Sequence, residues 1–454
     1  MKTKFSLTTA TALVIANMVG TGVFTSLGFQ VVGLSSGFAL MFLWALGGLA
    51  ALAGALTYSE AAVLYPRCGG EYHYLTKMYH REVGFLAGWI SLVVGFAAPV
   101  AVSSMALGKY MGGALSLPKA LPGSFSFLKT QTLIALAVVA VLTGIHALNK
   151  KIGAKFQNAI TIFNVLFVLS IVVLGLVLGK STSLSFGLSR AAAHDIFSPA
   201  FWTSMFFVSF AYSGWNAAAY VAGEIDRPSR NLPISLITGT LFVIGLYLFL
   251  NFVFLYTVPI AQIKGQVEVG LIFATNVFGP TAGRIMGGII SFLLLASASA
   301  MIIAGPRINK VLGEDYYIFR WMGRSSRRDT PAIAIVFQGL LSCLYIITSS
   351  FEQVMVFIGF TLSLFTFMTV LGVMIVRRKH PELPRPYKTL GYPVVPIFFL
   401  LFSLFLLGYG ILYRTKESLF GIGITLVGLL VYAIDKKVRP KDFKPLGDGA
   451  PCPD

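Results

Sequence analysis

The chain consists mostly of long apolar runs, each of about 20 residues or more, separated by short polar connections. Fifty-six per cent of the residues are hydrophobic, only 11% are charged, and the mean hydropathy is +0.80. An α-helix of about 20 residues crosses the roughly 30 Å hydrocarbon core of a bilayer. The strands of a membrane β-barrel would be shorter and would alternate in polarity, which this sequence does not do. The composition therefore predicts an all-α polytopic membrane protein.

Twelve of the apolar runs are predicted to be membrane spans. They cover residues 6–31, 36–65, 82–112, 130–148, 154–178, 199–225, 232–258, 280–311, 331–349, 353–376, 393–413 and 418–435. The connections leave no room for a soluble domain. The segment 66–81 mixes aromatic with polar residues, and we expect it to form a helix that lies along the membrane surface.

The formal charge of +18 is distributed unevenly between the two sets of loops. With twelve spans and the N-terminus inside, most of the 35 Lys and Arg residues fall on the inner side. The positive-inside rule then places both termini in the cytoplasm. We expect a multi-pass protein of the cell (inner) membrane. The charge therefore indicates topology and contact with anionic lipid, not binding to nucleic acid.

The cysteines and the N-terminus give two further expectations. Cys68 and Cys452 fall on the predicted reducing side and Cys343 lies within a span, so we expect no disulfide framework. The chain enters its first span almost at once, with no small-residue cleavage site after it, so no cleavable signal is expected.

Two of the spans are interrupted by glycine in the same way. The interruptions read Val19-Gly20-Thr21-Gly22 in the first span and Tyr212-Ser213-Gly214-Trp215 in the sixth. Glycine destabilises a helix interior, and unwound backbone at membrane depth is tolerated only beside protein or a watery cavity. A matched pair of interrupted spans is the best sequence pointer to the binding site of a transporter. The alternative is that these glycines only allow close helix packing.

Spans 1–5 and 6–10 are predicted to be two copies of one unit. Gly20 and Gly214 occupy corresponding places, and because five is odd the second copy enters the membrane from the opposite side. This is the 5+5 inverted repeat of the leucine-transporter-like fold, with discontinuous helices 1 and 6. The predicted divisions are 1–178 for helices 1–5, 199–376 for helices 6–10, 393–438 for helices 11–12 and 439–454 for a cytoplasmic tail.

The breaks predict a site for a molecule that carries both charges. The half-helix after the first break begins near Val23, and its free N–H groups suit a carboxylate. The half-helix before it ends near Met18 with free carbonyls, which suit an ammonium group. The second break adds carbonyls near Phe210 and Ser213. A free amino acid has this distribution of charge.

The side chains around the breaks leave two points open. Phe207, Tyr212 and Trp215 flank the second break, where they can cover a substrate or simply pack. Ser297 and Ser299 form the densest polar patch of the eighth span, where they can face the cavity or a cation, or bond back to their own helix.

No Asp, Glu, Lys, Arg or His lies near the middle of any predicted span. A charge at that depth is costly and usually functional, so its absence argues against a proton relay and against a buried acid for a polyamine. The five His residues are scattered near loops, and we expect no catalytic residues, metal site or cofactor.

At these residues the chain resembles the amino acid–polyamine–organocation superfamily and, within it, the L-type amino acid transporter branch. Residues 20–24 are similar to the family's G-[ST]-G-[IV]-F, residues 66–74 to P-x-x-G-G-E-Y-x-Y, and residues 210–216 to F-A-Y-x-G-W-N. G-E-I at 223–225 with R-N-L-P at 230–233, T-P-A at 330–332, and R-P-Y-K…G-Y-P at 385–393 occur in the same order.

The resemblance implies a sodium-independent carrier of amino acids that alternates between outward and inward states. Gly20, Thr21 and Gly22 would bind the carboxylate through backbone N–H groups. Met18, Phe210 and Ser213, next to Gly214, would bind the ammonium group through carbonyls. Neutral amino acids are the expected substrates.

Two departures from the family pattern bear on mechanism. Many relatives carry a Lys in the fifth span, where this chain has Asn164, so the mode of coupling stays open. Animal L-type carriers are linked to a heavy chain through a Cys between spans 3 and 4, and residues 113–129 contain none. We therefore expect a monomer or homodimer without a disulfide-linked partner.

Three alternatives to an exchanger or facilitator remain at this stage. One is a proton-coupled carrier of amino acids or polyamines. Another is an amino acid sensor that keeps the fold without turnover. The third, a membrane enzyme, would need clustered catalytic groups at one depth, and the sequence shows no such cluster.

Overall fold

The computed structural model describes residues 4–67, 69–118, 120, 129–148, 154–322, 331–440 and 443. Within these ranges the chain is helical, with only two isolated β-bridges, Phe5 with Ile225 and Ala120 with Lys129. The first-half elements are α1 (Leu7–Met18), α2 (Thr21–Thr25), α3 (Leu27–Gln30), α4 (Gly37–Leu64), α5 (Glu71–Met78), α6 (Arg81–Ile90), η1 (Ser91–Gly95), α7 (Ala97–Ala114), α8 (Thr130–Leu148), α9 (Ala154–Leu178) and α10 (Arg190–Phe197).

The second half begins with the other broken helix. Its elements are α11 (Pro199–Tyr212), α12 (Ala217–Tyr220), η3 (Ala222–Glu224), α13 (Pro228–Thr257), α14 (Ile260–Ile263), α15 (Val269–Phe278), α16 (Pro280–Asp315), η4 (Tyr317–Phe319), α17 (Ala332–Thr348), α18 (Phe351–Lys379), α19 (Val394–Tyr413) and α20 (Thr415–Val438).

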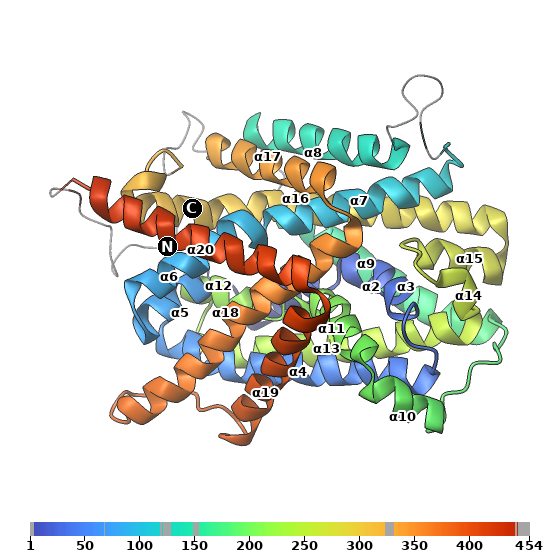
Figure 1. Cartoon of the computed structure of the whole chain (residues 1–454), viewed down its shortest axis with the longest axis horizontal. Helices are drawn as coiled ribbons and strands as arrows, with labels where there is room; N and C mark the ends of the chain where they lie inside the picture. The colour runs from blue at the N-terminus through green and yellow to red at the C-terminus, as the bar shows by residue number, and fades with distance from the viewer. Residues whose placement is uncertain are drawn as a thin grey trace.

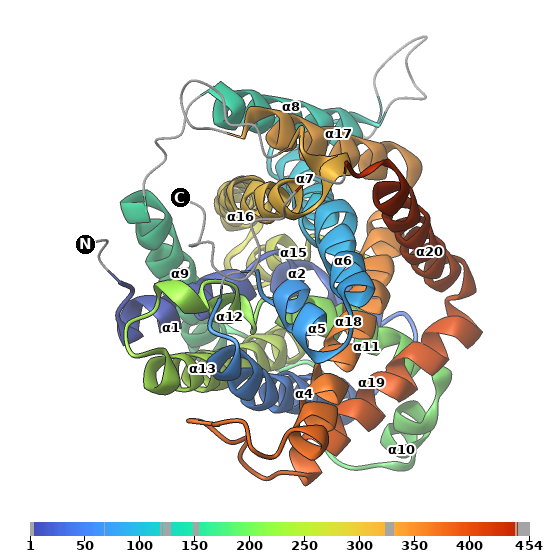
Figure 2. The same cartoon turned by 90° about the vertical axis from the view of Figure 1, so that its left-hand side faces the viewer.

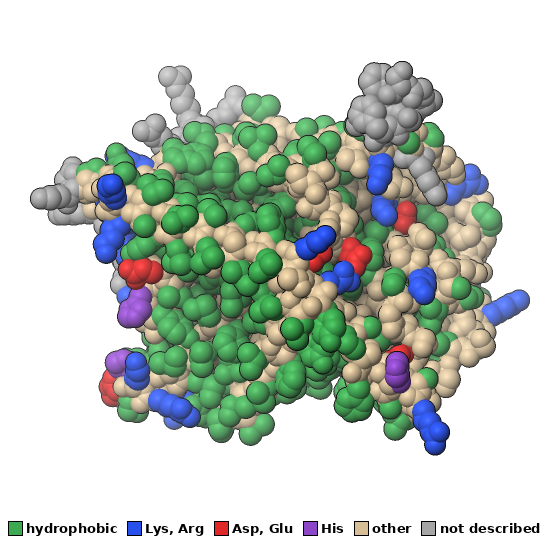
Figure 3. All heavy atoms as spheres, viewed as in Figure 1, with side chains coloured by type: hydrophobic (Ala, Val, Ile, Leu, Met, Phe, Trp, Pro, Cys, Tyr) green, Lys and Arg blue, Asp and Glu red, His purple; other side chains and the backbone are tan. Residues whose placement is uncertain are grey.

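In the described part of the chain, ten helices are long and apolar enough to cross a membrane, and α15 and α17 are shorter apolar helices. Hydrophobic side chains cover the middle of the surface in Figure 3, while most charged side chains lie towards its left and right edges. The prediction of an all-helical, multi-pass membrane protein is confirmed.

The long helices form two packed groups. In one group α4 and α1 pack against α13, and α11 packs against α4; in the other, α7 packs against α16 and α8, and α17 packs against α8. Several of these helices run along the long axis in Figure 1 and are seen end-on in Figure 2, where α8 and α17 form the outer flank. The short elements α2 and α12 lie near the centre, between the two groups.

Two elements differ from the sequence prediction in ways that matter for the site. The third span is not continuous, because a π-helical turn, η1, separates α6 from α7. Pro99 follows this turn and has no N–H for the carbonyl four residues before it, which favours a wider turn there. The helix expected within 66–81 is present as α5, but most of its side chains are buried against the rest of the protein.

A further apolar helix, α15, lies between residues 258 and 280, where the sequence predicts only a connection between two spans. Its ten residues are too few to cross a bilayer, which is why a search for spans passes over it. It packs against α16 instead.

Candidate functional site

The first predicted break is present. Helix α1 ends at Met18, and α2 begins at Thr21, two residues earlier than the sequence predicted. Val19 and Gly20 between them have non-helical backbone angles, with Gly20 at φ −140° and ψ −146°. The first N–H groups of α2 therefore lie at the break without partners in their own helix.

The second break is also present, between Tyr212 at the end of α11 and Ala217 at the start of α12. Gly214 has a φ of +95°, a conformation that residues with a side chain rarely adopt. The unwound turn therefore depends on glycine at this position.

The two breaks touch each other through their glycines. A Cβ atom on Gly22 would lie 2.5 Å from Ala211 Cα, and a Cβ on Gly214 would lie 2.7 Å from the carbonyl oxygen of Asn17. Each broken helix thus presses a glycine against the backbone of the other. Gly22 and Gly214 therefore allow close helix packing, as the alternative interpretation predicted, and they also line the cavity described next.

A cavity of about 330 Å³ opens beside both breaks. All seven residues of the predicted substrate site lie on its wall, namely Met18, Gly20, Thr21, Gly22, Phe210, Ser213 and Gly214. Further residues of α1, α11 and α12 line it, and α4, α5, α7, α16, α18 and α19 contribute the rest of its wall. The η1 turn contributes Gly95, and Pro99 follows it on α7, so the wide turn forms part of this wall.

Some of the carbonyls at the breaks already accept hydrogen bonds from the protein. The hydroxyl of Tyr247, from α13, donates to Met18 O at 2.5 Å and to Ala211 O at 3.3 Å. Phe210 O accepts from the backbone N and the hydroxyl of Ser213, at 3.0 and 2.6 Å. A carbonyl has two lone pairs, so Met18 O can still accept a second donor, whereas both lone pairs of Phe210 O are already used by Ser213. Ser213 O accepts no hydrogen bond within the described residues.

The three residues predicted for coupling do not lie together. Asn164, on α9, donates from Nδ2 to Val19 O at 2.9 Å, and its buried Oδ1 has no partner. Ser297 lines the cavity opposite Gly20, whose added Cβ would lie 3.5 Å from Ser297 Oγ. Ser299 is not on the cavity wall and instead makes a 2.8 Å hydrogen bond with Nε2 of His146 on α8.

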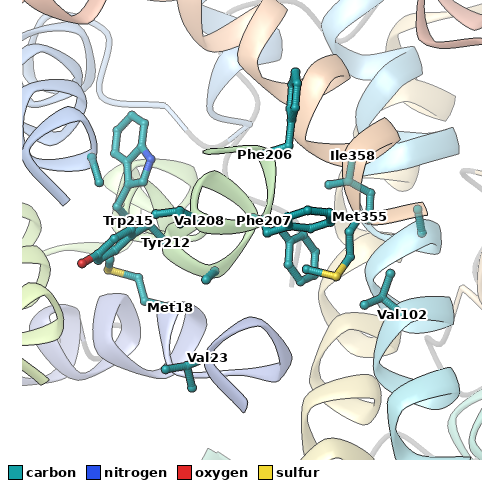
Figure 4. Packing of buried hydrophobic residues seen from close by; sticks show 14 of the residues in the cluster. Met18, Val23, Val102, Phe206, Phe207, Val208, Tyr212, Trp215, Met355 and Ile358 are labelled. Atoms are coloured by element: carbon teal, nitrogen blue, oxygen red, sulfur yellow. The ribbon is translucent and has the colours of Figure 1, made fainter. Parts of the chain in front are cut away.

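Two of the three aromatic residues flanking the second break reach the cavity. Trp215 and Tyr212 line it, and the Trp215 ring meets that of Tyr58 edge-on at 4.7 Å. Figure 4 shows these two residues beside Met18. The Tyr212 hydroxyl donates to Trp44 O at 3.2 Å, so both rings are also held by packing.

Phe207 lies elsewhere. It is buried one to two turns before the break, away from the cavity wall, and lies beside Met355 in Figure 4. Its ring stacks on Phe29 of α3 at 5.4 Å, and Phe29 stacks on Phe351 at 5.7 Å. These three rings join α3, α11 and α18.

Several site residues were not predicted from the sequence. Tyr247 and Ser103 contact the first break from distant helices, with Ser103 Oγ 2.6 Å from the hydroxyl of Thr21. Glu71 reaches the cavity from α5, outside every predicted span. Because Glu71 lies outside the spans, the lack of charges in the middle of the spans gives no information about it. Its place in the G-G-E-Y motif was the only available signal.

Among the described residues no group of three His, Cys, Asp or Glu is placed to hold a metal ion.

The sequence is similar to amino acid transporters along nearly its whole length. The chain is 27% identical to the human b(0,+)-type amino acid transporter 1 over 95% of this chain and 88% of that protein. It is 29% identical to the serine/threonine exchanger SteT of Bacillus subtilis over 96% and 98%. It is 25% identical to the mouse large neutral amino acids transporter small subunit 2 over 98% and 83%.

A family model described as amino acid permease matches residues 5–434, which is nearly the whole chain. The match includes both broken helices and every described element that lines the cavity. The chain therefore belongs to the amino acid permease family.

Proposed function

We propose that this protein exchanges amino acids across a membrane by alternating access, using the cavity between the two breaks as its substrate site. The observation that carries the proposal is the pair of unwound segments that touch each other and share one cavity. The names of the relatives, which include amino acid transporters and an exchanger, support transport by exchange and not an enzymatic activity.

The substrate would bind through the backbone at both charged ends. The N–H groups of Gly20, Thr21 and Gly22 at the start of α2 would hold the carboxylate, because a helix N-terminus carries partial positive charge. Within the described residues the carbonyl of Ser213 has no protein donor, so it is the first choice for the ammonium group, with the second lone pair of Met18 O beside it. Phe210 O, which already accepts two hydrogen bonds from Ser213, could bind the ammonium group only in place of one of them. No charged side chain is needed for either contact.

The packing of the helices supports a twelve-span, inverted-repeat arrangement with the divisions given above. Two broken helices with reciprocal glycine contacts are what a twofold-related pair would produce. The two packed groups could rock against each other around the cavity, as alternating access requires. With both termini in the cytoplasm of an inner cell membrane, α5 and η3 would face the cytoplasm and the stack of Phe29, Phe207 and Phe351 would close the outer side.

Asn164 would take part in coupling by linking the first break to α9. Its amide holds Val19 O from α9, so a neutral hydrogen bond joins the unwound segment to that helix. Ser297 would contribute a hydroxyl to the same side of the cavity, whereas Ser299 would act only through α8. The absence of a Cys in residues 113–129 supports a carrier without a disulfide-linked partner.

Counterflow in proteoliposomes tests this function. Vesicles loaded with an unlabelled amino acid should take up the same labelled amino acid transiently, without sodium and without a pH gradient. We expect neutral amino acids to give the fastest exchange in a panel of all twenty. Uphill accumulation that needs an acidic exterior would instead indicate a proton-coupled carrier, and no counterflow for any of the twenty would indicate a sensor.

A further inference from the structure

Among the described residues, one acidic side chain lines the cavity without belonging to the predicted substrate site. Glu71 is the first residue of α5, it is only 4% exposed, and it lies on the cavity wall. Its Oε1 accepts hydrogen bonds from the Tyr58 hydroxyl of α4 at 2.8 Å and from Asn216 Nδ2 at 3.1 Å. Tyr220 of α12 also faces this carboxyl group and lowers its pKa. One carboxyl group therefore links α4, α5 and α12.

The local sequence holds Glu71 in this position. Gly70 precedes it with a φ of +54°, and a Cβ on Gly70 would lie 2.6 Å from the Tyr220 ring. Gly69 N also donates to Tyr220 O at 3.3 Å. The paired glycines therefore let the start of α5 lie directly against α12, within reach of its side chains.

The groups facing the carboxyl group are neutral near pH 7. They are the phenols of Tyr58 from α4, Tyr74 from α5 and Tyr220 from α12, together with the amide of Asn216. Glu60, the nearest acid along α4, is engaged elsewhere with two arginines of the α18 end and the loop after it. Burial raises the pKa of Glu71 from 4.5 to about 7, and the bonds from Tyr58, Tyr220 and Asn216 lower it in part.

We propose that Glu71 is a positioning residue of the transport cycle, whose carboxyl group ties α12 to α4 and α5 and whose protonation holds that end of the cavity closed. This inference rests on the proposed function and adds to it that α12 moves when the cavity opens to the cytoplasm. Opening would separate Glu71 from Asn216 and Tyr220 and let water reach it. The ionised form is therefore favoured in the open state and the protonated form in the closed state.

The sign of the pH effect follows from linkage. The closed state has the higher pKa, about 7 against an ordinary 4.5 when the group is hydrated, so protons stabilise the closed state. Between pH 8 and pH 6 the ratio of closed to open protein should rise about tenfold. Exchange that requires opening towards the cytoplasm should slow by a similar factor over this range, with a midpoint near pH 7.

The test is counterflow in proteoliposomes with the same pH on both sides, measured from pH 5.5 to pH 8.5. Glu71→Gln cannot titrate, so its exchange rate should be flat across the range and close to the slow wild-type rate at acidic pH. Glu71→Asp keeps a carboxyl group and should keep a pH-dependent profile. Tyr58→Phe removes a donor that lowers the pKa of Glu71, so it should move the midpoint to higher pH.

Tyr74→Phe is the matched control for Tyr58→Phe. Tyr74 also contacts α12, through a 2.9 Å hydrogen bond from its hydroxyl to Ala219 O, but it does not donate to Glu71. It should leave the midpoint within the error of the wild-type value. If Glu71→Gln does not fold, Tyr58→Phe and Tyr74→Phe still decide the matter, because only the first should shift the profile.

The outcomes separate the two proposals. If the wild-type protein exchanges no amino acid at any pH, the proposed function fails, and this inference fails with it. If the wild-type protein exchanges amino acids but its profile is flat, or Glu71→Gln keeps the wild-type profile, the role of Glu71 is wrong while the proposed function stands.

Discussion

At the scale of single residues, Gly20 and Gly22 lie two positions apart in the chain but have different surroundings. The missing side chain of Gly22 makes room for the backbone of Ala211, whereas the missing side chain of Gly20 faces open cavity towards Ser297. A substitution at Gly22 would therefore disturb helix packing and binding together. Gly20 is the position at which binding can be tested alone.

We predict that Gly20→Ala lowers exchange without unfolding the protein. The added methyl group would meet Ser297 Oγ at 3.5 Å, an ordinary contact, but it would crowd the N–H groups at the start of α2. Losing one hydrogen bond to a charged carboxylate costs about 1.5–3 kcal/mol, so the apparent affinity should fall about tenfold or more. The control is Gly245→Ala, whose Cβ meets nothing within 4 Å. Equal exchange by the two variants would contradict backbone binding.

A second prediction concerns Tyr247, whose hydroxyl donates to the backbone of both broken helices. Tyr247→Phe would leave the carbonyls of Met18 and Ala211 without this donor, which should reduce stability by about 1–3 kcal/mol. The melting temperature of the purified protein measures this loss. Tyr256→Phe, on the same helix, removes a hydroxyl with no hydrogen bond among the described residues, and it should melt like the wild type. Identical melting of both variants would show that the contact does not stabilise the breaks.

The positions of the two helix breaks could be predicted from the sequence, but the side chains from other helices that form hydrogen bonds with the breaks could not. Gly20 and Gly214 are visible because glycine clusters are rare within apolar spans. Tyr247 and Ser103 are ordinary residues of their own helices, and they become site residues only through packing between distant segments. The contact of Ser299 with His146 was hidden for the same reason.

At the scale of elements, the site is made by irregular segments within otherwise regular helices. The breaks after α1 and α11 and the wide turn η1 all lie on one cavity. Pro99 favours the wide turn, but a proline in a helix can also produce a simple kink, so the sequence alone did not predict this geometry. The buried position of α5 was also not predictable, because its mixture of aromatic and polar residues is equally typical of an interfacial helix.

The contact between the broken helices gives a third prediction. Gly214→Ala would both strain a backbone with a φ of +95° and push a methyl group to 2.7 Å from Asn17 O. Gly265→Ala is the matched control, because Gly265 has a φ of +71° but nothing within 4 Å of its added Cβ. Strain alone costs about 1–2 kcal/mol, so Gly265→Ala should lower stability by that amount and Gly214→Ala by clearly more. Equal losses would show that the two breaks do not press on each other.

At the scale of the whole molecule, helices of both packed groups line the cavity, and the charged side chains on the face drawn in Figure 3 lie mainly towards the two ends of the long axis. Apolar run length was enough to predict the helical membrane class, because few other solutions satisfy backbone hydrogen bonds in lipid. It was not enough to predict α15, which packs against the protein without crossing the bilayer.

The proposed orientation gives a fourth prediction. In intact cells a membrane-impermeant maleimide should not label Cys68 or Cys452, because both would face the cytoplasm in the proposed orientation. Ser181→Cys, at an exposed position after α9 on the predicted outer side, should be labelled without permeabilisation. Labelling of Cys68 or Cys452 in intact cells would reverse the orientation.

The most direct test of the central claim is competition for exchange by substrate analogues that lack one charged group. For the amino acid that the protein exchanges fastest, the decarboxylated amine and the deaminated acid keep the side chain but lose one end of the zwitterion. If the two breaks hold opposite ends of the substrate, both analogues should compete at least tenfold more weakly than the parent amino acid. Competition by either analogue as strong as that of the parent would contradict the account.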